Sequence, residues 1–140
     1  MRVTSTTPGE SKAATRQFIE DVWNNGRYEL GLEHLAPDFV NHTPFGDETR
    51  EQFLDRIRAF RTAFPDLHMT VEEMLHDGDR VITRFSVRGS HRGPFRGIRA
   101  SGRTIGVMGI AIDRVANAER VEGWAVLDLF GLMQQIGAVP

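Results

Sequence analysis

The segment 104–137 constrains the fold more strongly than any other part of the chain. Apolar residues alternate with others over 104–115 and again over 120–127, and this period of two predicts two long β-strands. The polar break at 116–119 has the length of a hairpin turn, and Asn117 suits a turn position, so the strands are expected to pair antiparallel. Apolar residues lie on both faces of the first strand, which predicts a central strand that is covered on both sides.

Asp128 follows the second strand and precedes an apolar run with helical spacing, 129–136. Aspartate is a favoured N-cap, so this residue is expected to begin a short C-terminal helix. A carboxylate beside Trp124 and other apolar side chains could also act as a general acid or base. The sequence leaves both interpretations of Asp128 open.

Apolar residues recur at helical spacing in three segments of the N-terminal half of the chain. They predict helices over 11–24, 28–35 and 50–64. Ser11 is expected to cap the first helix, and residues 1–11 are expected to form a flexible lead-in. A brief extended piece, 39–42, separates the second helix from the third.

Beyond Pro65 the period of the apolar pattern changes to two. Strands are predicted over 67–76 and 81–91, with a turn at 77–79 between them and a Gly- and Arg-rich connection at 92–102 after them. Because helices come first and strands later, the fold class is predicted to be α+β. The expected architecture is a small cone, in which a curved antiparallel sheet wraps on three N-terminal helices and encloses an apolar cavity.

Composition limits the partners of the chain. A length of 140 residues suits a single domain, 1–140, with a core of its own. The net formal charge of -2 gives no reason to expect a nucleic-acid or membrane partner, and the absence of cysteine excludes disulfides and thiolate catalysis. The N-terminus lacks the apolar core of a signal peptide and no apolar run approaches the roughly 20 residues that span a bilayer, so a cytoplasmic protein is expected.

His42 and His91 are the histidines that the predicted strands place nearest a cavity. Each could act there as an acid, a base or a hydrogen-bond donor. Alternatively, each bonds a backbone carbonyl near the end of its strand. The spacing of the histidines matches no metal-binding motif, so no metal site is predicted.

The remaining charged residues predict surface positions. Asp113 and Glu122 lie near the predicted hairpin turn, where a solvated carboxylate is the usual state. Arginines gather between Arg80 and Arg103, and the balancing acids elsewhere favour solvated side chains there over an anion-binding surface.

Several short motifs recur in one order along the chain. They are F-V-N-H at 39–42, R-T-A-F-P-D-L at 61–67, D-G-D-R-V at 77–81, G-S-H-R-G at 89–93, S-G-R-T-I at 101–105, V-E-G-W-A-V-L-D at 121–128 and G-L-M-Q-Q-I-G at 131–137. In order and spacing the chain resembles the SnoaL-like polyketide cyclase family, which has the nuclear-transport-factor-2-like fold. The resemblance extends from about residue 14 to the C-terminus.

The resemblance implies a cone-shaped α+β barrel with an internal ligand cavity, a homodimer formed through the outer face of the sheet, and no metal or organic cofactor. Members of the family close an aromatic polyketide ring by intramolecular aldol chemistry, and others are hydroxylases of similar molecules. The aldol cyclases carry an acid/base aspartate immediately before the tryptophan of the last strand, where this chain has Gly123. Two further polar cavity positions of the family correspond to Ala111 and Ala125.

Two functions remain open on this resemblance. In the first, the chain is an enzyme of secondary metabolism, a cyclase or hydroxylase of a hydrophobic polyketide-type molecule. His42 and His91 would then polarise the substrate and Asp128 would move the proton. The substrate would contact Trp23, Asn41, Phe85, Met108, Ile112 and Trp124. In the second, the chain is a non-catalytic module that binds a hydrophobic small molecule in a roomier pocket.

Overall fold

The structure, a computed structural model, describes residues 7–140 of the chain. The N-terminal half contains three α-helices, α1 (Pro8–Phe18), α2 (Tyr28–His34) and α3 (Arg50–Ala63), and one π-helical segment, η1 (Ile19–Asn24), which continues α1. Six elements are strands: β1 (Leu35–Thr43), β2 (Gly46–Thr49), β3 (His68–Asp77), β4 (Arg80–Ser90), β5 (Thr104–Ala116) and β6 (Glu119–Leu127). The helix α4 (Leu129–Gln135) follows the last strand.

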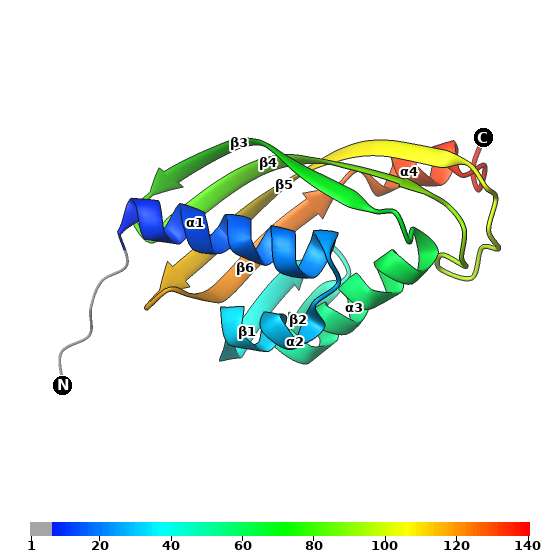
Figure 1. The fold of residues 1–140 in the computed structure, drawn as a ribbon. Helices are drawn as coiled ribbons and strands as arrows, with labels where there is room; N and C mark the ends of the chain where they lie inside the picture. Colours follow the sequence, from blue (N-terminus) through cyan, green and yellow to red (C-terminus); the bar gives the residue numbers. More distant parts are fainter. Residues whose placement is uncertain (1–6) are drawn as a thin grey trace.

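The six strands form one sheet in the order β2-β1-β6-β5-β4-β3, so β5 is central, as predicted. Neighbouring strands pair antiparallel except β1 and β6, which run parallel. The sheet is curved and unclosed, and it arches over α1, while α3 lies beside β1 and β2 (Figure 1). The predicted α+β class and the wrapping of a curved sheet on the N-terminal helices are therefore confirmed. The four strands predicted to pair antiparallel, β3 to β6, do so, and β1, which the sequence marked only as an extended piece at 39–42, joins the sheet in parallel beside β6.

The β5–β6 hairpin forms as its alternation predicted. Asn117 and Ala118 both have positive φ, 53° and 62°. Positive φ at both central residues defines the type I′ turn, whose twist matches that of the flanking strands. The ladder runs from Ala116 opposite Glu119 to Gly109 opposite Leu127.

The first helix begins earlier than predicted. Thr7, rather than Ser11, is the N-cap, and its side chain accepts a hydrogen bond from the backbone N–H of Glu10. Pro8 occupies the first helical position, which favours proline because that N–H needs no partner. The flexible lead-in is therefore wrong for residues 8–11, and its first six residues lie outside the described part of the chain.

The remaining helices have the predicted positions. Thr49 and Gln52 form a reciprocal capping box at the start of α3. The second helix ends at His34 and the strand β1 continues through Pro37, which therefore does not stop the helix. The pairing of β1 with β6 changes register between Leu35 and Val40, where proline offers no N–H to the ladder.

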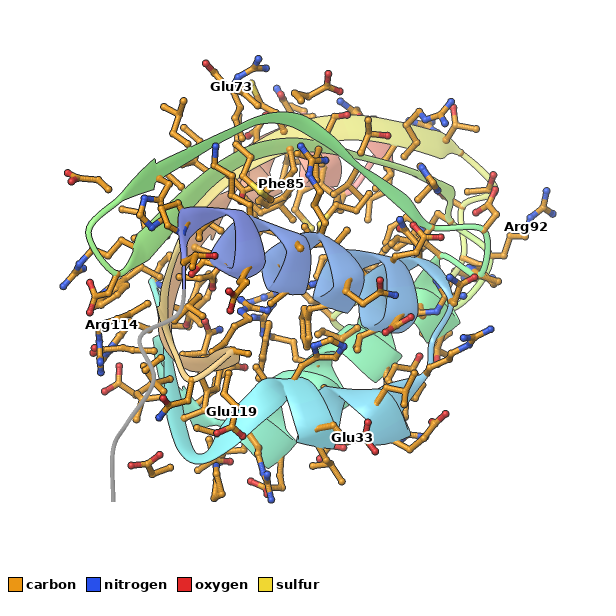
Figure 2. All side chains as sticks on the ribbon, turned by 60° about the vertical axis from the view of Figure 1, so that its left-hand side comes forward. Glu33, Glu73, Phe85, Arg92, Arg114 and Glu119 are labelled. Carbon is orange, nitrogen blue, oxygen red and sulfur yellow. The ribbon has the colours of Figure 1, made fainter. Side chains whose placement is uncertain are left out.

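The two faces of β5 differ in exposure. Ile105 and Val107 are buried against the helices, whereas Met108 and Ile110 are each 49% exposed on the opposite face. Val126 extends this exposed apolar surface onto β6. The prediction that both faces of β5 are covered is therefore wrong for the single chain. Figure 2 shows Phe85 pointing to the interior side of the sheet and Glu73 pointing away from it.

The core lies between the concave face of the sheet and the helices. One part packs Phe60, Phe64, Val87 and Ile136, and a second packs Phe18, Phe39, Phe53 and Ile57 under β1. Among the described residues, no helix combines the length and the apolar character that crossing a membrane requires.

Candidate functional site

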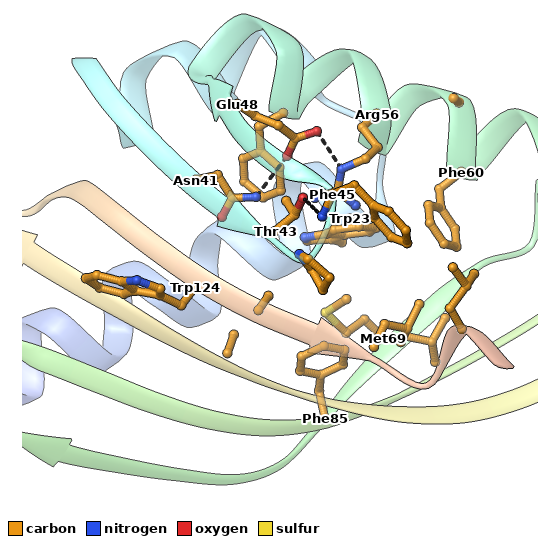
Figure 3. Close-up of a pocket in the computed structure, with 18 of the residues that line it drawn as sticks. Trp23, Asn41, Thr43, Phe45, Glu48, Arg56, Phe60, Met69, Phe85 and Trp124 are labelled. Atoms are coloured by element: carbon orange, nitrogen blue, oxygen red, sulfur yellow. Dashed lines mark hydrogen bonds and ion pairs between the residues drawn. The ribbon is translucent and has the colours of Figure 1, made fainter. Parts of the chain in front are cut away.

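A cavity of about 570 Å³ lies between the concave face of the sheet and the helices. Aromatic and aliphatic side chains form most of its wall, among them Phe53 and Phe95. Figure 3 labels four others, Trp23, Phe60, Met69 and Phe85. A cavity of this size with a mainly apolar wall and a few polar groups is typical of small-molecule sites. We refer to it as the pocket.

A row of inward-facing residues crosses four strands at one end of the pocket. Asp113 on β5 lies opposite Gly123 on β6, Gly123 lies beside Asn41 on β1, and Asn41 lies opposite Glu48 on β2. Residues paired across neighbouring strands point to the same face of a sheet. Two carboxylates, of Asp113 and Glu48, and the amide of Asn41 therefore point to one face of the sheet, and all three residues line the pocket.

Glu48 is held by two hydrogen bonds. Asn41 donates from Nδ2 to Oε1 at 2.9 Å, and Arg56 of α3 donates from Nε to Oε2 at 2.8 Å. Both interactions are visible in Figure 3. They fix the Asn41 amide, whose Oδ1 then faces away from Glu48.

Asp113 and Arg120 form a buried ion pair whose side chains are only 3% and 8% exposed. Arg120 donates from both Nε and Nη2 to Oδ1 of Asp113. Its guanidinium carbon also lies 4.3 Å from the centre of the Phe18 ring, a cation–π geometry. The prediction that Asp113 is a solvated turn residue is wrong. Asp113 has the strand parity of the buried Ile105 and Val107, and that signal could have found it.

Gly123 brings two oxygens of this row close together. A Cβ at this position would lie 3.0 Å from Oδ1 of Asn41 and 3.1 Å from Oδ1 of Asp113. Such contacts are tighter than most side chains accept, so glycine permits the approach of both oxygens. Position 123 thus carries no side chain, while Oδ1 of Asp113 lies close to it.

Thr83 on β4 lies one row further along the sheet, opposite Ala111. Its side chain lines the pocket and the residue is 1% exposed. Its hydroxyl oxygen finds no hydrogen-bond partner among the described residues. A buried hydroxyl without a partner is unusual in a folded protein and needs an explanation.

His42 does not line the pocket. It connects two strands, because Nδ1 lies 2.8 Å from Oδ1 of Asp47 and Nε2 lies 2.7 Å from Oε2 of Glu122. The hydrogen bonds to Glu122 and Asp47 raise the pKa of His42, and the bond to His42 lowers the pKa of Glu122. The His42 ring also stacks on that of Trp124, with 5.1 Å between ring centres.

His91 is fully buried but lies outside the lining of the pocket. The strand β4 ends at Ser90, so the parity that would have turned His91 toward the cavity does not continue to it. The backbone N–H of Ser101 donates to Nδ1 at 3.1 Å, and the ring packs on Phe64. His91 thereby anchors the connection between β4 and β5.

Asp128 is the N-cap of α4. Its carboxylate accepts a hydrogen bond of 2.9 Å from the backbone N–H of Gly131. It is absent from the lining of the pocket. Of the two interpretations of this residue, the structure therefore confirms the helix cap.

The predicted contact residues divide between the two faces of the sheet. Trp23, Asn41 and Phe85 line the pocket. Met108 and Ile112 do not line it, because their strand parity is opposite to that of Asp113. Trp124 also borders the pocket, but alternation along β6 turns its ring to the face opposite Gly123, where it stacks on His42.

Two segments that the sequence marked only as connections meet at the mouth of the pocket. Phe45, in the turn between β1 and β2, is 72% exposed. The guanidinium of Arg96, from the connection between β4 and β5, lies 4.9 Å from the Phe45 ring. Within residues 7–140, no group of three or more His, Asp or Glu side chains is arranged to hold a metal ion.

Comparison with known proteins identifies relatives along most of the chain. The sequence profile of the SnoaL-like polyketide cyclase family matches residues 13–136. No curated protein sequence matches the chain significantly.

Solved structures agree with this profile. AclR, a proposed hydroxylase from Streptomyces galilaeus, is 26% identical with a TM-score of 0.85, over 96% of this chain and 100% of AclR. TsrD from Streptomyces laurentii is 26% identical with a TM-score of 0.85, over 95% and 98% of the two chains. IdmH, a proposed polyketide cyclase from Streptomyces antibioticus, is 28% identical with a TM-score of 0.82, over 91% and 98%.

Proposed function

Since the chain belongs to the SnoaL-like polyketide cyclase family, we propose that its pocket binds a hydrophobic, aromatic polyketide-type molecule and transforms it by cofactor-independent acid/base chemistry. One observation carries this proposal: an apolar, largely aromatic pocket of about 570 Å³ has ionisable side chains gathered at one end. The apolar wall suits a flat ring system. The polar end suits the carbonyl and hydroxyl groups that such rings carry.

We assign proton transfer to Asp113. The sequence suggested His42, His91 and Asp128, but none of these lines the pocket. An intramolecular aldol closure needs a base that removes a proton from the carbon beside one carbonyl. The resulting enolate then attacks a second carbonyl, whose C=O π bond opens to an alkoxide, and the protonated base returns its proton to that alkoxide. The carboxylate of Asp113 is oriented by Arg120 and borders the pocket, so it can accept that proton.

The ion pair of Arg56 and Glu48 is assigned a different role, the stabilisation of negative charge on the substrate. Arg56 lines the pocket and is hydrogen-bonded to Glu48. A guanidinium near a developing enolate oxygen stabilises its negative charge. Arg56 is therefore our candidate for that role, with Glu48 as the residue that positions it.

The alternative function is a non-catalytic binding module. It is favoured by the pairing of both pocket carboxylates, because Arg120 and Arg56 already neutralise Asp113 and Glu48.

A substrate screen tests the proposal. The purified protein is incubated with a panel of aromatic polyketides, and binding is followed by thermal shift while mass spectrometry follows turnover. Stabilisation together with a product of altered mass or retention supports the enzyme, provided that Asp113→Asn abolishes the product and still folds. Stabilisation without product supports the binding module. No stabilisation by any member of the panel would contradict both functions.

We also propose that the protein is a homodimer that buries the outer face of the sheet. Met108, Ile110 and Val126 expose apolar side chains there, each about half exposed or more. A contiguous exposed apolar surface is typical of an interaction site. Light scattering after gel filtration measures the mass directly, and a monomer at micromolar concentration would refute this arrangement.

A further inference from the structure

Three hydrogen-bonding side chains from three strands gather at the polar end of the pocket. Asn41 comes from β1, Thr83 from β4 and Asp113 from β5, and the residues are 2%, 1% and 2% exposed. All three line the pocket. Asp113, Gly123 and Asn41 are successive cross-strand partners, and Thr83 lies opposite Ala111, two residues from Asp113 along β5.

We propose that these residues form a subsite for a neutral hydroxyl group of the ligand, a phenol or an enol. We call it the hydroxyl subsite. The inference rests on the proposed function, in which the pocket binds an aromatic molecule, and adds the polar group that this molecule must present.

The subsite offers mainly acceptors. Asn41 donates its Nδ2 hydrogen to Glu48, which leaves its carbonyl oxygen directed to the space beside Gly123. The Oδ1 atom of Asp113 would lie 3.1 Å from a Cβ at the same position, so glycine at 123 lets the two acceptor oxygens approach each other. Acceptor oxygens bind a hydrogen-bond donor, so a ligand hydroxyl can bond them and an ether oxygen cannot.

Thr83 supplies the independent observation. Its hydroxyl is buried and has no partner among the residues that the structure describes, and the residue lines the pocket. A buried polar group without a partner destabilises the empty protein, and a ligand group that bonds it gains binding energy. The hydroxyl of a bound phenol can donate to Asp113 and accept from Thr83, which satisfies both side chains.

The charges at this end favour a neutral ligand group. The guanidinium of Arg120 is engaged by Asp113. A ligand carboxylate at the hydroxyl subsite would lie next to the Asp113 carboxylate, and like charges repel strongly where water is excluded.

Calorimetric titration of three matched anthraquinones tests the subsite. The probes are 2,6-dihydroxyanthraquinone, its dimethyl ether and anthraquinone-2-carboxylate. The proteins are the unsubstituted chain, Thr83→Val and the matched control Thr70→Val, which changes the same residue type on β3 at a position that does not line the pocket. We expect the dihydroxy compound to bind at least about fivefold more tightly than the other two, since a typical net hydrogen bond contributes about that factor and one to a charged group contributes more.

Thr83→Val is expected to remove most of that preference, to leave binding of the dimethyl ether unchanged, and to raise the Tm of the empty protein, because an unpaired buried hydroxyl is lost. Thr70→Val should change neither the preference nor the Tm in this way. Equal affinity for the dihydroxy compound and its ether, or a preference that survives in Thr83→Val, would overturn the hydroxyl subsite alone. If none of the three compounds binds, the aromatic pocket of the proposed function falls, and the subsite with it.

Discussion

The buried pair of Asp113 and Arg120 gives the most quantitative prediction. Both side chains are almost fully excluded from solvent, at 3% and 8% exposure. Removing one partner of such a pair leaves an uncompensated charge in the interior, which costs about 3–5 kcal/mol. In Arg120→Met the contact of the guanidinium with Phe18 is lost as well, but the methionine retains an apolar side chain of similar length.

We therefore expect Arg120→Met to lower the free energy of unfolding by about 3–5 kcal/mol, and the Tm by roughly 10–15 °C in a domain of this size. Replacing both partners by apolar residues of similar volume is often neutral. The double variant Asp113→Val with Arg120→Met should accordingly recover to within about 1 kcal/mol of the unsubstituted chain.

Urea denaturation of the unsubstituted chain, Asp113→Val, Arg120→Met and the double variant forms a double-mutant cycle. The cycle measures the coupling free energy between the two side chains directly. A double variant as unstable as the sum of the single variants would show that the two charges are not coupled. A cost below about 1 kcal/mol for Arg120→Met alone would show that the pair is solvated, contrary to the burial on which the argument depends. If Asp113 and Arg120 form part of the ligand site, the stable double variant should nevertheless lose binding of 2,6-dihydroxyanthraquinone.

Three further predictions concern residues outside the pocket. Asp128→Ala should lower the free energy of unfolding by about 1 kcal/mol in urea, and Asp128→Asn should preserve it, since both Asp and Asn cap helices well; equal losses would contradict the cap. The folded-state pKa of His42 is raised above 6.5 by Glu122 and Asp47, so the Tm lost in His42→Gln should be largest below pH 6.5 and should fade as pH rises through the higher pKa; a loss that grows with pH has the wrong sign. Met108→Glu should yield a monomer by light scattering, and an unchanged dimer would exclude the outer face as its interface.

Local patterns were enough to predict most of the elements. The period of two located β3 to β6, the polar break with Asn117 located the hairpin turn, and Asp128 as an N-cap marked the start of α4. Pairing between distant segments has no such local signal. The parallel contact of β1 with β6, and the short edge strand β2, follow from tertiary packing and were therefore missed.

The site was harder to predict than the fold because side-chain direction decides it. His42 points to carboxylates on neighbouring strands, and His91 follows the end of β4, so neither reaches the pocket. Asp113 was assigned to solvent by its nearness to the turn, although its parity along β5 placed it on the buried face. Its partner Arg120 is one ladder step from the turn, and only the folded hairpin brings the two charges together.

The central claim is that the functional groups of this protein are those of the pocket, with Asp113 foremost, and not the histidines that the sequence suggested. Mass spectrometry of products formed from aromatic polyketides by Asp113→Asn and His42→Gln, each shown by circular dichroism to be folded, tests this most directly. The account predicts that Asp113→Asn forms no product and that His42→Gln forms product at nearly the rate of the unsubstituted chain. Full turnover by Asp113→Asn together with loss of turnover in His42→Gln would contradict it.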